Sequence, residues 1–163
     1  MNKPEGCPKS FPEPASAVAE PSAAPVRVLV VDDYEPFRRF VCSTLQERPE
    51  LQVIGEASDG LEAVQKAKEL KPDLILLDIG LPTLNGVDVS RRISMVVPAA
   101  KILVVSQNND ADVARAVLSD GASGYVLKLD ANKELLRAVE VVLQGGRFVS
   151  TGVRHGDGIP PSG

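Results

Sequence analysis

The sequence predicts an α/β fold in which five parallel strands form a doubly wound sheet covered by five helices. From Val26 onward, short apolar runs alternate with segments whose apolar residues recur at helical spacing, which is the pattern of βα units around a parallel sheet. The runs at 26–31, 73–77 and 101–105 are almost continuously apolar, as is typical of central strands buried on both faces. A chain of 163 residues is long enough for one such domain.

The elements follow one another in a regular order. We expect the strands at 26–31, 51–57, 73–77, 101–105 and 124–127. Apolar residues at i, i+3, i+4 and i+7 predict helices at about 35–47, 61–70 and 85–95, a fourth that ends at Gly121 and a fifth that ends at Gly145 and Gly146. The second of these helices has Ser58 or Asp59 as its capping residue and Pro72 just beyond its end.

The two ends of the chain differ in composition from its centre. Residues 1–25 hold six prolines among Ala, Ser and Glu, a composition that predicts a disordered leader. Residues 26–149 form the predicted domain. Residues 150–163 return to small and polar residues, which predicts a flexible tail, and the single histidine, His155, lies there and has no expected role.

The charge and hydropathy of the chain exclude several classes of protein. A net charge of −4 and a pI near 5.1 argue against direct binding of nucleic acid, which needs a basic face. No apolar run approaches the length of a membrane span, and the N-terminus lacks the pattern of a secretory signal, so we expect a cytoplasmic protein with no membrane partner. Cys7 and Cys42 are then reduced thiols.

Charged and hydroxyl residues stand where four of the strands end. Asp32 and Asp33 follow the first strand, Asp78 the third, Ser106 the fourth and Lys128 the fifth. Since ligands of open parallel sheets bind outside the carboxyl ends of the strands, we expect these residues to converge on one crevice. Three crowded carboxylates repel one another, and a hard divalent cation that prefers oxygen ligands relieves this repulsion. The sequence therefore predicts a Mg²⁺ site.

The same residues predict chemistry on a phosphoryl group. Lys128 supplies a positive charge and Ser106 a hydrogen-bond donor for phosphoryl oxygens. A carboxylate acts as a nucleophile toward phosphorus and forms an aspartyl phosphate. Asp78 is the candidate nucleophile, because it follows a central strand and precedes the turn sequence DIGLPTLNG, which exposes its side chain.

At these residues the sequence resembles the receiver domain of bacterial two-component response regulators. The resemblance is carried by VVDD, DLILLDIGLPTLNG, VVS and GASGYVLK, which stand in this order at the ends of successive strands. It covers about residues 26–149 and implies the flavodoxin-like strand order 2-1-3-4-5. By position, it implies that Asp78 is the phosphoacceptor, that Asp33, Asp78 and the backbone carbonyl of Gly80 bind Mg²⁺, and that Asp32 assists through a water molecule.

The resemblance also implies a switch and its partners. Ser106 and Tyr125 match the pair in which the hydroxyl moves toward the phosphoryl group and the ring turns inward. This movement alters the face made by the fourth helix, the fifth strand and the fifth helix, which is a possible homodimer surface. The phosphoryl donor is a sensor histidine kinase or a phosphotransfer protein, since the chain has no kinase motifs of its own.

Two residues depart from the usual family pattern. Gln107 stands where a small residue usually follows the switch hydroxyl, so we expect it to affect access to an aspartyl phosphate and its lifetime. Leu129 replaces the proline that often follows the lysine, as in receivers that precede a helix-turn-helix output domain. The segment ELLRAVEVVLQGGRFVS also resembles that subgroup, but the output module is absent, and we expect a stand-alone receiver in preference to a fragment of a DNA-binding regulator.

Other functions remain open on the residues alone. A Mg²⁺-dependent phosphohydrolase uses similar chemistry, but the short connections leave no room for a substrate cap. A receiver fold that serves only as a protein-interaction module does not need the acids and the lysine. Taken alone, Asp32 with Asp33 is equally compatible with a helix-capping pair, but Asp78 and Lys128 favour a functional site. Phe37 and Phe40 are assigned to the core.

Overall fold

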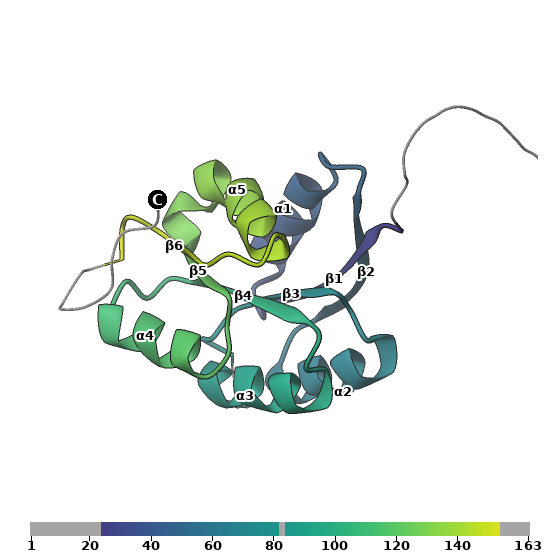
Figure 1. Ribbon diagram of the computed structural model, residues 1–163, viewed down its shortest axis with the longest axis horizontal. Helices are drawn as coiled ribbons and strands as arrows, with labels where there is room; N and C mark the ends of the chain where they lie inside the picture. The colour runs from purple at the N-terminus through teal and green to yellow at the C-terminus, as the bar shows by residue number, and fades with distance from the viewer. Residues whose placement is uncertain (1–23, 82–83, 154–163) are drawn as a thin grey trace, which may run out of the picture.

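The structure, a computed structural model, describes residues 24–81 and 84–153 and folds them around one parallel sheet (Figure 1). Its strands are β1 (Val26–Val31), β2 (Leu51–Ala57), β3 (Leu74–Leu77), β4 (Lys101–Ser106), β5 (Gly124–Leu127) and β6 (Phe148–Val149). Its helices are α1 (Glu35–Leu45), α2 (Gly60–Leu70), α3 (Gly86–Val96), α4 (Ala111–Ser119) and α5 (Ala131–Leu143), with a short 3-10 turn at Lys128–Asp130. The expected strands and helices are all present. Most of the predicted leader, with Cys7, and the position of His155 lie outside the described residues.

The strands lie in the order β2-β1-β3-β4-β5-β6, and every neighbouring pair is parallel. The first five positions confirm the flavodoxin-like order expected from the sequence. The sixth strand was not predicted. It pairs with the outer edge of β5, where Tyr125 lies opposite Val149.

The domain also extends further than the sequence predicted. Ser150 and Val153 are buried, so the chain stays packed against the domain beyond the expected boundary at Val149. Two apolar residues are too short a run to show the period of a strand, and the small polar residues that follow are typical of loops. The rest of the predicted tail, from residue 154, lies outside the described residues.

Helices cover both faces of the sheet (Figure 1). One buried cluster lies between the sheet and helices α1 and α5, and it includes Val41, Leu45 and Leu135. The other lies between the sheet and helices α2, α3 and α4, and it includes Ala67 and Ile93. Strands β1, β3 and β4 are central, and burial on both faces explains their almost continuous apolar sequences.

Local signals set the ends of the helices. The side chain of Asp59 accepts a hydrogen bond of 2.9 Å from the N–H of Glu62, which identifies Asp59 as the cap of α2. This helix ends at Lys71, which adopts a left-handed conformation with φ of 48° directly before Pro72. Gly121 follows α4 with φ of 112°, a conformation that glycine adopts without strain. No helix within the described ranges is long and apolar enough to cross a membrane.

Candidate functional site

Three carboxylates meet where β1 and β3 end. Asp32 and Asp33 follow β1, Asp78 follows β3, and one carboxylate oxygen from each lies within 4.8 Å of the others. Asp32 is 3% exposed and Asp78 is 6% exposed, whereas Asp33 is open to solvent. The expectation that the turn after Asp78 exposes its side chain is therefore wrong, because this carboxylate is buried at the wall of the cavity. The N–H of Tyr34 donates to Asp32 Oδ1 at 2.8 Å and fixes that carboxylate. The structure therefore brings together the acids that the sequence singled out.

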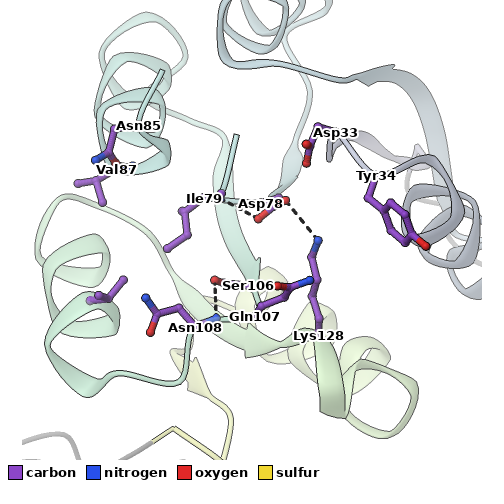
Figure 2. Close-up of a pocket in the computed structure, with 12 residues that line it drawn as sticks. Asp33, Tyr34, Asp78, Ile79, Asn85, Val87, Ser106, Gln107, Asn108 and Lys128 are labelled. Carbon is purple, nitrogen blue, oxygen red and sulfur yellow. Dashed lines mark hydrogen bonds and ion pairs between the residues drawn. The ribbon is translucent and has the colours of Figure 1, made fainter. Parts of the chain in front are cut away.

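Lys128 reaches this acidic cluster from the end of β5. Its Nζ lies 3.2 Å from Asp78 Oδ2 (Figure 2). The same atom lies 2.8 Å from Asp32 Oδ2. Burial acts to lower the pKa of this ammonium, but the hydrogen bond with Asp32 and the charges of Asp78 and Asp32 outweigh it and raise the pKa of Lys128. The lysine is therefore a fixed cation that bridges two carboxylates.

Both carboxylate oxygens of Asp78 have partners, as those of Asp32 do. The N–H of Gly80 donates to Asp78 Oδ1 at 2.9 Å, while Lys128 contacts Asp78 Oδ2. Burial raises the pKa of Asp78, and the hydrogen bond from Gly80 and the charge of Lys128 oppose that rise without cancelling it. The two carboxylate oxygens thus have different partners, one a backbone amide and the other an ammonium.

The turn after Asp78 is held by close contact between the backbones of Ile79 and Gly86. The N–H of Gly86, at the start of α3, donates to the carbonyl of Ile79 at 3.2 Å. A Cβ at Gly86 would lie 2.1 Å from the Cα of Ile79, so no other residue fits without displacing that turn. Asn85 caps α3 by accepting from the N–H of Val87 at 2.8 Å. The sequence NG that follows the predicted phosphoacceptor therefore has a structural role.

Ser106 and Tyr125 are linked through one residue of the loop after β4. The Oγ of Ser106 accepts a hydrogen bond of 3.0 Å from the N–H of Asn108. The hydroxyl of Tyr125 donates to the carbonyl of Asn108 at 2.6 Å. The Tyr125 side chain is fully buried, and this burial raises the pKa of its phenol. Asn108 was not predicted from the sequence, because it acts through its backbone and has no distinctive spacing.

A cavity of about 640 Å³ opens over these residues. Asp33, Asp78, Ser106 and Lys128 line it, and Figure 2 shows their side chains directed toward one another from different strand ends. Gln107 lines the same cavity and is exposed, and its expected effect on phosphoryl lifetime stays a prediction. Leu129, the second departure from the family pattern, is 87% exposed beside Lys128.

Phe37 contributes to the site, although the sequence assigned it only to the core. Its ring packs against the buried cluster under α1 and α5, and the Nζ of Lys128 lies 4.6 Å from its centroid. Phe37 lies in the first turn of α1, close in sequence to Asp33, but no sequence signal identifies its contact with Lys128.

The donor set at this strand end suits a hard cation. The three carboxylates offer only oxygen atoms, and one ammonium compensates part of their charge. Mg²⁺ prefers one or two carboxylates and retains water, and the exposed Asp33 leaves such a cation accessible from the cavity. Asp33, Asp78 and the neighbouring Gly80 are the residues that would hold it, and the arrangement is suited to binding and transferring a phosphoryl group.

Comparisons with known proteins agree with this geometry. Residues 28–140 match the response regulator receiver domain. The transcriptional regulatory protein DegU of Brevibacillus brevis is 39% identical over 131 residues, which is 80% of this chain and 55% of that protein. A putative transcriptional regulator of Pseudomonas aeruginosa is 40% identical over 126 residues, which is 77% of this chain and 60% of that protein.

Solved structures show the same fold. The receiver domain of the putative response regulator NarL from Mycobacterium tuberculosis is 31% identical with a TM-score of 0.71 and covers 76% of this chain and 99% of that one. A LuxR-family response regulator from an Aurantimonas species is 32% identical with a TM-score of 0.73 and covers 78% of this chain and 90% of that one. This chain spans 55% to 60% of the length of the two curated relatives named above. It belongs to the response regulator receiver domain family, the signalling switches of two-component systems.

Proposed function

We propose that the protein is a phosphorylation-activated switch that accepts a phosphoryl group from a partner histidine onto Asp78. The observation that carries this proposal is the setting of that carboxylate. It lies at the wall of an open cavity, within 3.2 Å of Lys128 and in a cluster with two further acids. A buried acid with one cation and an accessible face is suited to a transient covalent bond with phosphorus.

The transfer is a displacement at phosphorus. An oxygen of Asp78 forms a bond to phosphorus as the bond to the donor histidine nitrogen breaks, and the electron pair returns to the imidazole, which takes up a proton. Lys128 and the hydroxyl of Ser106 stabilise the phosphoryl oxygens. Mg²⁺, when bound by Asp33, Asp78 and Gly80 with Asp32 acting through water, neutralises negative charge on the phosphoryl group and the acids.

Ser106 and Tyr125 form the switch that responds to phosphorylation of Asp78. The hydroxyl of Ser106 gains a new acceptor when a phosphoryl group is attached to Asp78, and both switch residues share Asn108 as a partner. The charge added at Asp78 thereby shifts the conformational equilibrium of the loop between β4 and α4. The buried position of Tyr125 in this structure corresponds to the inward orientation of that scheme.

The partners follow from the family and remain proposals for this chain. A sensor histidine kinase or phosphotransfer protein supplies the phosphoryl group, in the cytoplasm. The relatives named above are transcriptional regulators, so DNA binding is a proposal for a longer protein that carries this domain, not for the acidic domain itself. A homodimer would use α4 and α5, because β6 already occupies the outer edge of β5.

Incubation with acetyl phosphate and Mg²⁺, followed by intact mass measurement, tests the proposal. We expect the mass of one phosphoryl group to be added, to be lost in Asp78→Asn, and to remain in Asp88→Asn, a matched change of an exposed acid on α3. Sustained release of phosphate from small substrates would favour a phosphohydrolase. No reaction in the wild-type protein would favour an interaction module and contradict the proposal.

A further inference from the structure

The segment that follows α5 returns to the sheet and adds to the strand that carries the switch. Residues 148–153, here named the exit strap, begin with β6, which pairs in parallel with β5 (Figure 1). Phe148 lies opposite Gly124, and Val149 lies opposite Tyr125. The strap therefore pairs with the backbone of the switch tyrosine from the outer side of β5.

Ser150 continues this pairing beyond the end of β6. Its N–H donates to the carbonyl of Tyr125 at 2.9 Å, and its Oγ accepts a hydrogen bond of 2.9 Å from the N–H of Leu127. The same hydroxyl donates to the carboxylate of Glu134 on α5. The carbonyl of Ser150 also accepts from the N–H of Val153 at 3.2 Å, so this fully buried serine is hydrogen-bonded through both its backbone and its side chain and is a fixed part of the fold.

The apolar side chains of the strap surround the same position. Val149 and Val153 are buried in the cluster that also contains the ring of Tyr125. Val149 is the register partner of Tyr125 on the outer side of β5, and both side chains belong to the same buried cluster. A docked strap therefore favours the buried orientation of the ring, because it supplies part of the apolar cluster in which the ring packs.

Strand β5 also connects the strap to the phosphorylation site. The last residue of β5 that the strap binds, Leu127, directly precedes Lys128, whose ammonium contacts Asp32 and Asp78. We propose that the exit strap is a positioning element for the switch, and that its docking against β5 and the phosphorylation of Asp78 reinforce each other. This inference rests on the proposed function, because it takes the buried orientation of Tyr125 as the one that phosphorylation favours.

The coupling is reciprocal by thermodynamic necessity. If phosphorylation favours buried Tyr125 and the docked strap favours it too, then each event strengthens the other by the same factor. Phosphorylation consequently tightens the segment through which the chain leaves the domain. Loosening the strap, in turn, weakens binding of a phosphoryl analogue at Asp78, which lies outside the strap's own contacts.

Beryllofluoride with Mg²⁺ serves as the phosphoryl analogue for the test. Hydrogen exchange of the full chain, followed by mass spectrometry, should show slower exchange in residues 148–153 when the analogue is bound. Ser150→Ala should weaken analogue binding by about twofold to tenfold, as expected for the loss of one or two buried hydrogen bonds. Thr151→Ala, at an exposed position of the same strap, should bind the analogue as the wild type does.

A second variant separates positioning from general loss of stability. Val153→Ala removes buried apolar contacts of the strap without changing its hydrogen bonds to β5, and it should also weaken analogue binding. Leu45→Ala, in the cluster on the opposite face, should destabilise the fold without changing analogue affinity in the folded protein. Unchanged exchange and unchanged affinity in both strap variants would overturn the inference and leave the proposed function intact. Failure of the wild-type protein to bind the analogue would overturn both.

Discussion

The ammonium of Lys128 lies 4.6 Å from the centroid of the Phe37 ring, at the mouth of the acidic cluster. An aromatic face attracts a cation, and the attraction is larger where water is excluded. Lys128 is mostly buried, and it contacts Asp32 and Asp78 on its other side. The ring and the two carboxylates therefore hold one flexible side chain in a single orientation.

We predict that Phe37→Leu weakens beryllofluoride binding and slows phosphorylation by acetyl phosphate by about fivefold, corresponding to about 1 kcal/mol for a partly desolvated cation and ring. Leucine retains apolar volume but lacks the aromatic face. Phe40→Leu is the matched control, because the Phe40 ring centroid lies 5.5 Å from that of Phe37 on the same helix, whereas the described ring contact of Lys128 is with Phe37. Equal effects of the two variants would show that packing of α1, not the ring beneath Lys128, controls the rate.

We predict that Asp33→Asn weakens binding of Mg²⁺ by at least about tenfold, the effect of losing about 1.4 kcal/mol of charge interaction. The protein has no tryptophan and two tyrosines, and Tyr34 is adjacent to Asp33 and 61% exposed, so tyrosine fluorescence reports the titration. Saturating Mg²⁺ should raise the melting temperature of the wild type, because a ligand that binds only the folded state stabilises it. Asp112→Asn, an exposed acid on α4, should leave both responses unchanged. An equal affinity in Asp33→Asn would contradict the assignment of Asp33 as a ligand.

The convergence of Asp32, Asp78 and Lys128 was predictable, because the carboxyl ends of all parallel strands lie at the same edge of the sheet. Residues that directly follow neighbouring strands therefore lie close together. The bond between Ser150 and Leu127 was not predictable, because a two-residue strand has no period and its partners are distant in sequence. The contact of Phe37 with Lys128 depended on how α1 packs on the sheet, which helical spacing does not determine.

The raised pKa of Asp78 predicts how stability depends on pH. Burial is the main cause, and it makes the folded carboxyl release its proton at a higher pH than the unfolded one. The folded state therefore binds more protons between the two pKa values, and the stability falls as the pH rises through that interval. Above that interval, the buried carboxylate lowers the free energy of unfolding by a constant amount.

We therefore predict that Asp78→Asn is more stable than the wild type at neutral pH in EDTA, and that the difference disappears as the pH falls from the folded pKa of Asp78 to its unfolded pKa. Lys128 keeps its ion pair with Asp32 in this variant, so no buried ammonium is left without a counter-charge. Urea unfolding across a pH series measures both quantities. A variant that is less stable at neutral pH would show that the attraction of Lys128 exceeds the penalty of burying Asp78.

Gln107 is exposed and lines the cavity between Ser106 and Asn108. A phosphoryl group on Asp78 is hydrolysed when water reaches phosphorus in line with the bond to the carboxylate oxygen. The side chain of Gln107 is long enough to occupy part of that approach, and its amide donates hydrogen bonds. It should therefore restrict the attacking water.

We predict that Gln107→Ala shortens the lifetime of the phosphorylated protein by about threefold to tenfold, which corresponds to about 0.7 to 1.4 kcal/mol of barrier. The lifetime is measured as the loss of added mass after removal of acetyl phosphate, with Mg²⁺ held constant. Gln46→Ala, at the end of α1, changes the same residue type outside the cavity and should not alter the lifetime. A longer lifetime in Gln107→Ala would mean that the amide orients the attacking water instead of excluding it.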